Sequence, residues 1–342
     1  MKEAGRSRSW LVAGLLLALS LAQAACGGGA SGQNDGGGVS GQIAVEGSST
    51  VLPITQAAAE AFSQENPDVK ISVGGAGTGD GFEAFCAGET HISDASRPID
   101  PEEEIPACEE NGVEYIEIPV AFDGLSVVVN PQNDFASDIT IEELKKLWEP
   151  AAEGKITQWS QVRSEWPDQE IALYGPGTQS GTFDYFTDEV VGEEGASRSD
   201  YQASEDDNVL VQGVSGDPNA LGYFGVSYYE TNRDSLKALA VNGVKPATEA
   251  IRSGEYPLSR PLFIYVSTKA IEDNPAVEEF VDFYVSEENL NRIVEQARYV
   301  TLPDSLAQEA RKQWEDRTTG TVYTEDGEPK GGDLESALQQ SQ

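Results

Sequence analysis

The fold of this chain is decided by the stretch Gly175-Pro176-Gly177-Thr178-Gln179-Ser180-Gly181-Thr182-Phe183-Asp184-Tyr185-Phe186. A short apolar run at 171–174 precedes it and is typical of a strand, and apolar residues recur after it at helical spacing. The stretch therefore predicts a strand, a glycine-rich turn and the start of a helix that Ser180 or Thr182 caps. The first N–H groups of a helix lack partners and its dipole is positive there, so such a turn can bind an anion. An ordinary capped helix would show the same pattern.

Three other places have the same order of an apolar strand, small or hydroxyl-bearing residues and a helix. They are Val45-Glu46-Gly47-Ser48-Ser49-Thr50-Val51, Val73-Gly74-Gly75-Ala76-Gly77-Thr78-Gly79 and Ile92-Ser93-Asp94-Ala95-Ser96-Arg97-Pro98. None of them matches a nucleotide-binding loop, because GxxxxGK[ST] is absent and the glycines lack the spacing of a dinucleotide fingerprint. Four such turns predict convergence on one small oxyanion.

The order of the predicted elements indicates an α/β fold. Strands and helices alternate from Ile43 to about Ile118, which predicts βα units and a largely parallel sheet. A long apolar run at 119–131 follows, and we expect it to leave one domain and enter another. The length of 342 residues suggests about two domains of ~100–200 residues each. The tail from Thr318 is polar and glycine-rich, and we expect it to be disordered.

The N-terminus has the features of a targeting segment. A basic stretch precedes an apolar run at 11–21 that is too short for a confident membrane span. Residues 1–25 are therefore predicted to be a signal peptide, and Cys26 looks like the lipid-bearing residue of a bacterial lipoprotein. Gln23 stands where such sites usually have Leu, so a plain cleaved signal peptide is the alternative. With lipid on Cys26, the polar run 26–41 would be a flexible tether that holds an extracytoplasmic protein to the membrane.

The cysteines and the histidine limit the possible chemistry. If Cys26 carries lipid, Cys86 and Cys108 remain as a pair, which we expect to form a disulfide outside the cytoplasm; two buried free thiols are the alternative. A zinc site is disfavoured because the chain has three Cys and one His, and we predict no metal and no cofactor. A serine-hydrolase triad needs a His, and the one His of the chain is His91, at the start of a predicted strand. The turn at Ser180 also lacks the GxSxG spacing of a nucleophile elbow. The sequence therefore predicts a binding protein and not an enzyme.

The chain is strongly acidic, with a formal net charge of −37 at pH 7. This charge disfavours nucleic-acid binding, which relies on Lys and Arg against phosphates. It does not exclude a small anion as the ligand. Surface charge is screened within about 8–10 Å at physiological salt, whereas a closed cleft acts through local dipoles.

Six motifs follow one another in an order that resembles a known family. They are Gly47-Ser48-Ser49-Thr50-Val51-Leu52-Pro53, Gly77-Thr78-Gly79, Ala95-Ser96-Arg97-Pro98, Asp123-Gly124-Leu125 with Val129-Asn130-Pro131, Ser180-Gly181-Thr182-Phe183, and Gly222-Tyr223-Phe224-Gly225. Over about residues 42–315 the chain resembles the periplasmic phosphate-binding proteins of the phosphate-specific ABC transporter. The resemblance implies a type II periplasmic-binding-protein fold, in which two α/β lobes joined by two crossings clamp dehydrated phosphate. Lobe 1 would be 42–121 with 259–320, lobe 2 would be 122–258, and 321–342 would be a disordered tail.

The resemblance also implies a partner and a set of ligand residues. The partner is the membrane permease of the ABC transporter, and we expect the binding protein to be a monomer. The phosphate contacts of the family fall here on Ser49, Thr50, the Val51 amide, Thr78, Ser96, Ser180, Gly181 and Thr182. Sulfate, molybdate or tungstate is the nearest alternative ligand, and a surface lipoprotein without a transport role is the alternative class.

One position departs from the family pattern. Many members have an Arg four residues before the Ser of the Ser-Gly-Thr turn, and this chain has Pro176 there. Arg97 is the nearest replacement, and we expect its guanidinium to bind phosphate oxygens. A surface ion pair with Asp94 or Asp100 is the alternative.

A buried carboxylate is expected to accept the proton that phosphate carries near neutral pH. Asp123 is the first choice, because it lies where the apolar run is expected to cross between the lobes. A plain turn residue before Gly124 is the alternative interpretation. Asp94 and Asp80 lie on two of the predicted anion turns and are the other candidates.

Overall fold

The structure is a computed structural model that describes residues 39–341. The predicted signal peptide, Cys26 and most of the predicted tether lie outside the described residues. Among residues 39–341, no helix is long and apolar enough to cross a membrane.

One large sheet organises the described chain. Its nine strands have the order β2-β1-β3-β11-β4-β8-β6-β7, with β9 also on β4, and a separate two-stranded sheet pairs β10 with β5. The strands are β1 (Gly41–Gly47), β2 (Val69–Val73), β3 (Ile92–Ala95), β4 (Tyr115–Val129), β5 (Asp138–Ile139), β6 (Ala172–Pro176), β7 (Gln202–Ser204), β8 (Ala220–Gly225), β9 (Lys237–Ala238), β10 (Ala240–Val241) and β11 (Ser259–Ser267). Strands β1 to β3 are parallel to one another, as are β6 to β8, which is the arrangement that the alternation of elements predicts.

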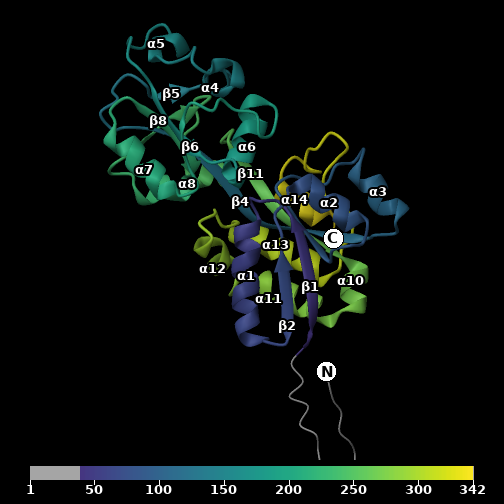
Figure 1. The fold of residues 1–342 in the computed structure, drawn as a ribbon. Helices are drawn as coiled ribbons and strands as arrows, with labels where there is room; N and C mark the ends of the chain where they lie inside the picture. The colour runs from purple at the N-terminus through teal and green to yellow at the C-terminus, as the bar shows by residue number, and fades with distance from the viewer. Residues whose placement is uncertain (1–38, 342) are drawn as a thin grey trace, which may run out of the picture. The chain divides into compact units, whose positions relative to one another are not determined.

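Helices cover the sheet in two groups. The helices are α1 (Leu52–Glu65), α2 (Thr78–Cys86), α3 (Glu104–Glu110), α4 (Ile141–Trp148), α5 (Trp159–Val162), α6 (Gly181–Phe186), α7 (Asp207–Gly216), α8 (Val226–Thr231), α9 (Thr248–Arg252), α10 (Thr268–Asp273), α11 (Pro275–Tyr284), α12 (Leu290–Gln296), α13 (Asp304–Glu315) and α14 (Leu334–Ser341), with a 3₁₀ turn at Pro150–Ala152 and a π-helix at Thr187–Val191. Figure 1 shows α4 to α8 around one end of the sheet, and α1, α2 and α10 to α13 around the other.

Strands β4 and β11 run between these two groups (Figure 1). All fifteen residues of β4 are buried, so both of its faces are covered. Its first part pairs antiparallel with β11 and its last part, from Leu125, pairs with β8. The pairing sets Arg260 of β11 opposite Asp123 of β4. Lobe boundaries at 121/122 and 258/259 would fall inside β4 and at the start of β11, and they remain our proposal.

Each predicted turn follows the end of a strand, and the first three turns are held together by backbone hydrogen bonds. The Ser48 N–H donates to the Asp94 carbonyl (2.8 Å), and the Gly77 N–H donates to the Gly47 carbonyl (2.9 Å). Gly47 has a φ of 147°, and a Cβ there would lie 2.0 Å from the Asp94 carbonyl oxygen. Glycine is therefore required where β1 meets β3.

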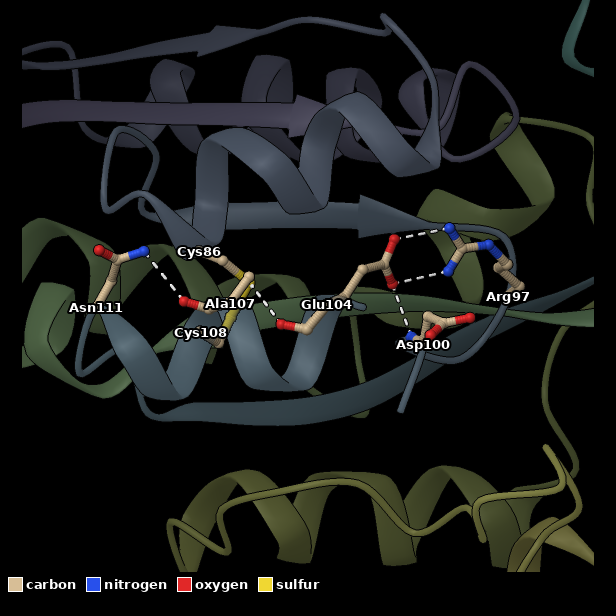
Figure 2. The surroundings of a disulfide bond; sticks show 7 residues. All are labelled: Cys86, Arg97, Asp100, Glu104, Ala107, Cys108 and Asn111. Atoms are coloured by element: carbon tan, nitrogen blue, oxygen red, sulfur yellow. Dashed lines mark hydrogen bonds and ion pairs between the residues drawn. A yellow bond between two sulfur atoms is a disulfide. The ribbon is translucent and has the colours of Figure 1, made fainter. Parts of the chain in front are cut away.

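The predicted disulfide is confirmed. Cys86, the last residue of α2, is bonded to Cys108 in α3 (Figure 2). The two residues are separated by 22 positions, for which the chain-entropy model gives a stabilisation of roughly 3 kcal/mol. The bond ties α2, whose other end carries Thr78, to the helix that follows the turn after β3.

The C-terminal segment corrects the sequence prediction. The sequence predicts disorder for 321–342, but residues 321–341 form an ordered strap that ends in α14. The buried Glu117 carboxylate accepts hydrogen bonds from the Thr321 hydroxyl (2.8 Å) and the Val322 N–H (3.0 Å). Leu338 of α14 is fully buried. These contacts involve one buried carboxylate and a short apolar face of the segment, while the rest of its surface is solvated. The segment is therefore polar on average, and its composition did not indicate the contacts.

Candidate functional site

Hydroxyl groups of the first three turns gather around one small cavity, the inner cavity. The Thr78 and Ser96 hydroxyls lie 3.0 Å apart, and the Ser96 N–H donates to Thr78 Oγ1 (3.3 Å). The full lining is Ser48, Ser49, Thr50, Gly77, Thr78, Ser96, Asp184, Tyr185, Asp188, Glu194 and Arg260. The turns meet because they leave the same ends of parallel strands, where ligands of open α/β sheets bind.

The fourth turn, at the start of α6, lies directly against the first. Ser180 caps α6 by accepting a backbone N–H of its first turn (3.2 Å), as the sequence predicts. The Gly181 carbonyl accepts the Thr50 hydroxyl (3.1 Å), and the Asp184 carboxylate accepts the Ser49 hydroxyl (2.9 Å). A Cβ on residue 181 would lie 2.5 Å from the Thr50 backbone nitrogen. Glycine at 181 therefore permits this approach.

This contact lies between the inner cavity and a larger one, the α6 cavity. The inner cavity has a volume of about 20 Å³, which is room for about one water molecule. The α6 cavity, of about 430 Å³, is lined by residues that include Asp123, Ser180, Gly181 and Thr182. Ser49 lines both cavities. The structure thus brings the predicted residues into one region, but a direct protein contact divides them into two sets.

Val51 takes part through its backbone in the turn itself. Its N–H donates to the Ser48 carbonyl (3.1 Å), and its side chain is fully buried. The amide that the resemblance assigns to phosphate is therefore engaged within the first turn in this conformation.

Arg97 lies at the edge of the region, in an ion pair. Its guanidinium donates two hydrogen bonds to Glu104 (2.7 and 2.8 Å) and one to the Pro98 carbonyl (3.1 Å), as Figure 2 shows for the Glu104 pair. Its side chain is 44% exposed. Arg97 lines an outer cavity of about 350 Å³ together with Thr78 and Ser96. The pairing partner is Glu104, and not Asp94 or Asp100.

Arg260 is a charged residue of this region that the sequence interpretation missed. It lies in β11, and its Nη2 donates to the Thr50 hydroxyl (3.0 Å). Its Nε lies 3.6 Å from an Asp123 carboxylate oxygen, and its side chain is 17% exposed. The centre of its guanidinium lies 3.8 Å from the centre of the Tyr185 ring. The sequence signal that could have indicated Arg260 is a basic residue directly after the expected crossing between the lobes at 258/259.

The three candidate proton acceptors lie in different places. Asp123 is buried and lines the α6 cavity; burial raises its pKa, and Arg260 acts against this shift. Asp94 is fully buried behind the first turn and lines none of the three cavities. Asp80 is exposed and lines the outer cavity.

Carboxylates that were not predicted lie closer to the hydroxyl groups. Asp184 and Glu194 line the inner cavity with Arg260. Burial raises the pKa of Asp184, while the Ser49 hydroxyl and Arg260 act against the shift. Burial also raises the pKa of Glu194, and Asp184 adds to the increase. The site therefore combines hydrogen-bond donors with carboxylates whose pKa is raised. Within residues 39–341, no group of three or more His, Cys, Asp and Glu side chains is arranged to hold a metal ion.

Comparison with known proteins identifies the family. A PBP superfamily domain matches residues 32–288. The chain belongs to the PBP superfamily. It is similar to protein SphX of Synechocystis sp., with 50% identity over 286 residues that cover 82% of this chain and 84% of that protein. It is also similar to the phosphate-binding protein PstS of Staphylococcus epidermidis, with 40% identity over 304 residues that cover 86% of this chain and 90% of that protein.

Solved structures agree with this assignment. A possible phosphate binding protein from Planctomyces limnophilus is 46% identical, with a TM-score of 0.77 over 81% of this chain and 99% of that one. A putative phosphate ABC transporter substrate-binding protein with bound phosphate from Clostridium perfringens is 28% identical, with a TM-score of 0.54 over 77% of this chain and 100% of that one. The predicted α/β binding-protein fold and the resemblance to phosphate-binding proteins are confirmed.

Proposed function

We propose that this protein binds inorganic phosphate outside the cytoplasm and delivers it to the membrane permease of an ABC transporter. The observation that carries the proposal is the meeting of four hydroxyl-bearing turns around one region at the ends of parallel strands. The phosphate-binding description of the Staphylococcus relative and of the phosphate-bound Clostridium structure supports it.

The chemistry of the site supports binding without catalysis. Ser180 is occupied as a helix cap. His91 accepts the Ala44 N–H at its Nδ1 (2.9 Å) and does not line the inner cavity. In the described part of the chain, no Ser–His pair is therefore in place to activate a nucleophile. We assign the protein to the transporter binding proteins, which are not enzymes.

Binding requires the first and fourth turns to separate. The inner cavity, of about 20 Å³, has room for about one water, and the outer cavity of about 350 Å³ shares Thr78, Ser96 and Arg260 with it. A tetrahedral oxyanion that contacts the first and fourth turns together therefore needs these turns to move apart. The Ser49 and Thr50 hydroxyls donate to Asp184 and Gly181, and phosphate oxygens would take over these donors. Opening and reclosing of two parts of an α/β protein around its ligand is a known form of hinge motion.

The membrane attachment belongs to the same proposal. We propose that Cys26 carries lipid and that the protein acts as a tethered monomer beside its permease. A lipid anchor would keep the binding protein near the membrane after removal of the signal peptide at 1–25. If the protein of the source cells were found in the soluble fraction and not with the membranes, the proposed anchor would be wrong.

The test is a calorimetric titration of the purified protein with phosphate, and then with sulfate, molybdate and tungstate. We expect phosphate to bind more tightly than the other three oxyanions. Phosphate at 100 times its dissociation constant should stabilise the fold by about 2.7 kcal/mol, which a rise in melting temperature would report. Tighter binding of sulfate, molybdate or tungstate would reassign the ligand, and the absence of any binding would leave a surface lipoprotein without a transport role.

A pair of matched variants locates the site. Ser180→Asp keeps a good helix cap but adds a negative charge to the fourth turn, so we expect a loss of phosphate affinity of at least tenfold. Thr140 caps α4 and lines none of the three cavities, so Thr140→Asp should bind like the wild type. Equal affinities of Ser180→Asp and the wild type would place the ligand elsewhere.

A further inference from the structure

We propose that Arg260 supplies the positive charge that binds the anion at this site. The inference rests on the proposed phosphate-binding function and adds the residue that provides the countercharge. It places this role on strand β11, between the two groups of helices, and not four residues before Ser180, where the chain has Pro176.

The first argument is position. Arg260 lines both the inner cavity and the outer cavity. It stands opposite Asp123 in the pairing of β4 with β11, and it reaches Thr50 of the first turn and the Tyr185 ring of α6. The guanidinium therefore touches both sides of the contact that has to open for an anion. Stacking on an aromatic face holds a planar guanidinium in one orientation.

The second argument is the number of free donors. A guanidinium has five N–H donors, and among the described residues Arg260 makes one hydrogen bond, to the Thr50 hydroxyl. Its Nε is buried and has no hydrogen-bond partner there, and the same holds for Asp123 Oδ2. Arg97 differs, because Glu104 and Pro98 take three hydrogen bonds from it. Asp123 is an ion-pair partner of Arg260 at 3.6 Å, which is longer than a hydrogen bond, so most of the guanidinium donors are available to an anion.

The third argument is the surrounding charge. Asp184, Asp188 and Glu194 line the inner cavity, and Arg260 is the single Lys or Arg among the described residues that does so. Its side chain is 17% exposed, compared with 44% for Arg97, so water screens its charge less. Without Arg260, an anion in this region would face carboxylates with no cation beside them. Loss of Arg260 should therefore weaken binding more than the loss of one ordinary hydrogen bond.

The experiment compares two arginines in the full chain. Phosphate is titrated calorimetrically into the wild type, Arg260→Gln and Arg260→Lys, and into the corresponding variants of the competing arginine, Arg97→Gln and Arg97→Lys. A charge-assisted hydrogen bond is typically worth about ten- to hundredfold in affinity. We expect Arg260→Gln to lose about 100-fold or more and Arg260→Lys about tenfold, because an ammonium cannot make the fork of bonds. Both Arg97 variants should stay within about threefold of the wild type.

The outcomes separate this inference from the proposed function. The wild-type titration tests the function: if another oxyanion binds in place of phosphate, the series is repeated with it and still tests Arg260. Binding of the wild type with unchanged affinity in both Arg260 variants, or an equal loss in the Arg97 variants, would overturn the role of Arg260. Binding of no oxyanion at all would overturn both. If Arg260→Gln does not fold, the comparison of Arg260→Lys with Arg97→Lys decides, since both keep the charge.

Discussion

Replacing Asp94 by Asn should remove a pH dependence of stability that its buried carboxyl group imposes. Asp94 has no exposed surface. Its Oδ1 accepts the Thr55 hydroxyl (2.9 Å), whereas its Oδ2 has no hydrogen-bond partner among the described residues. Burial raises the pKa of Asp94 from the ordinary value of 3.8 to about 8; the Thr55 hydrogen bond acts against this shift and Glu46 adds to it.

The sign and size of the effect follow from these values. Between about pH 4 and pH 8 the folded protein holds a proton on Asp94 that the unfolded chain has lost. The free energy of unfolding therefore falls as the pH rises through this window. A pKa difference of one corresponds to about 1.4 kcal/mol, so a rise from 3.8 to about 8 gives an upper figure of about 5–6 kcal/mol. Relaxation around the buried charge reduces this figure, and we expect a loss of at least about 2 kcal/mol between pH 5 and pH 8.

Urea unfolding at pH 5, 6.5 and 8 measures the effect. Asn is neutral and has nearly the same shape, so Asp94→Asn should be less sensitive to pH than the wild type by at least about 2 kcal/mol over this range. Asp80 lies in the first turn of α2 and is exposed, which makes Asp80→Asn the matched control, and it should follow the wild type. Parallel pH profiles of the wild type and Asp94→Asn would refute the reasoning.

The remaining predictions use the same protein. Gly181→Ala places a Cβ 2.5 Å from the Thr50 nitrogen, so calorimetry should show at least tenfold weaker phosphate binding. Replacing both disulfide cysteines, Cys86 and Cys108, by Ser should lower the free energy of unfolding by roughly 3 kcal/mol in urea. Glu117→Gln points an amide N–H₂ at donors of the strap, so limited proteolysis should release 321–341 faster than in the wild type. Asp184→Asn should reduce the preference for phosphate over sulfate in parallel titrations, because a neutral amide then replaces the carboxylate that would reject an anion without a proton.

The turns could be predicted from the sequence because their signals are local. A strand, a glycine and a hydroxyl residue before a helix lie within a few positions of one another, and the structure has a turn at each such place. Gly47 and Gly181 show why: each permits a backbone approach that a Cβ would block. The disulfide was also predictable, because Cys86 and Cys108 were the two cysteines left outside the targeting segment.

The residues that complete the site depend on contacts between distant parts of the chain. Arg260 reaches the site through the pairing of β4 with β11, which the sequence does not display. Arg97 is next to Ser96 in the sequence, but its guanidinium is hydrogen-bonded to Glu104 at the start of α3 (Figure 2). The strap was missed for the same reason, since its anchor is Glu117 near the start of β4.

The hydrogen bonds of the present conformation decide where the binding energy has to come from. Ser49 and Thr50 already donate to Asp184 and Gly181, so giving these donors to phosphate exchanges one acceptor for another and gains little. The net attraction must then come from donors that are not yet used, and the Arg260 Nε, which is buried and has no hydrogen-bond partner among the described residues, is such a donor. Asp184 loses the Ser49 hydroxyl in the exchange and needs another donor. The P–OH of phosphate can supply this donor, whereas sulfate near neutral pH carries no proton and would leave two negative groups facing each other. A site with few cations and many carboxylates can therefore bind an anion, provided that the anion brings a proton with it.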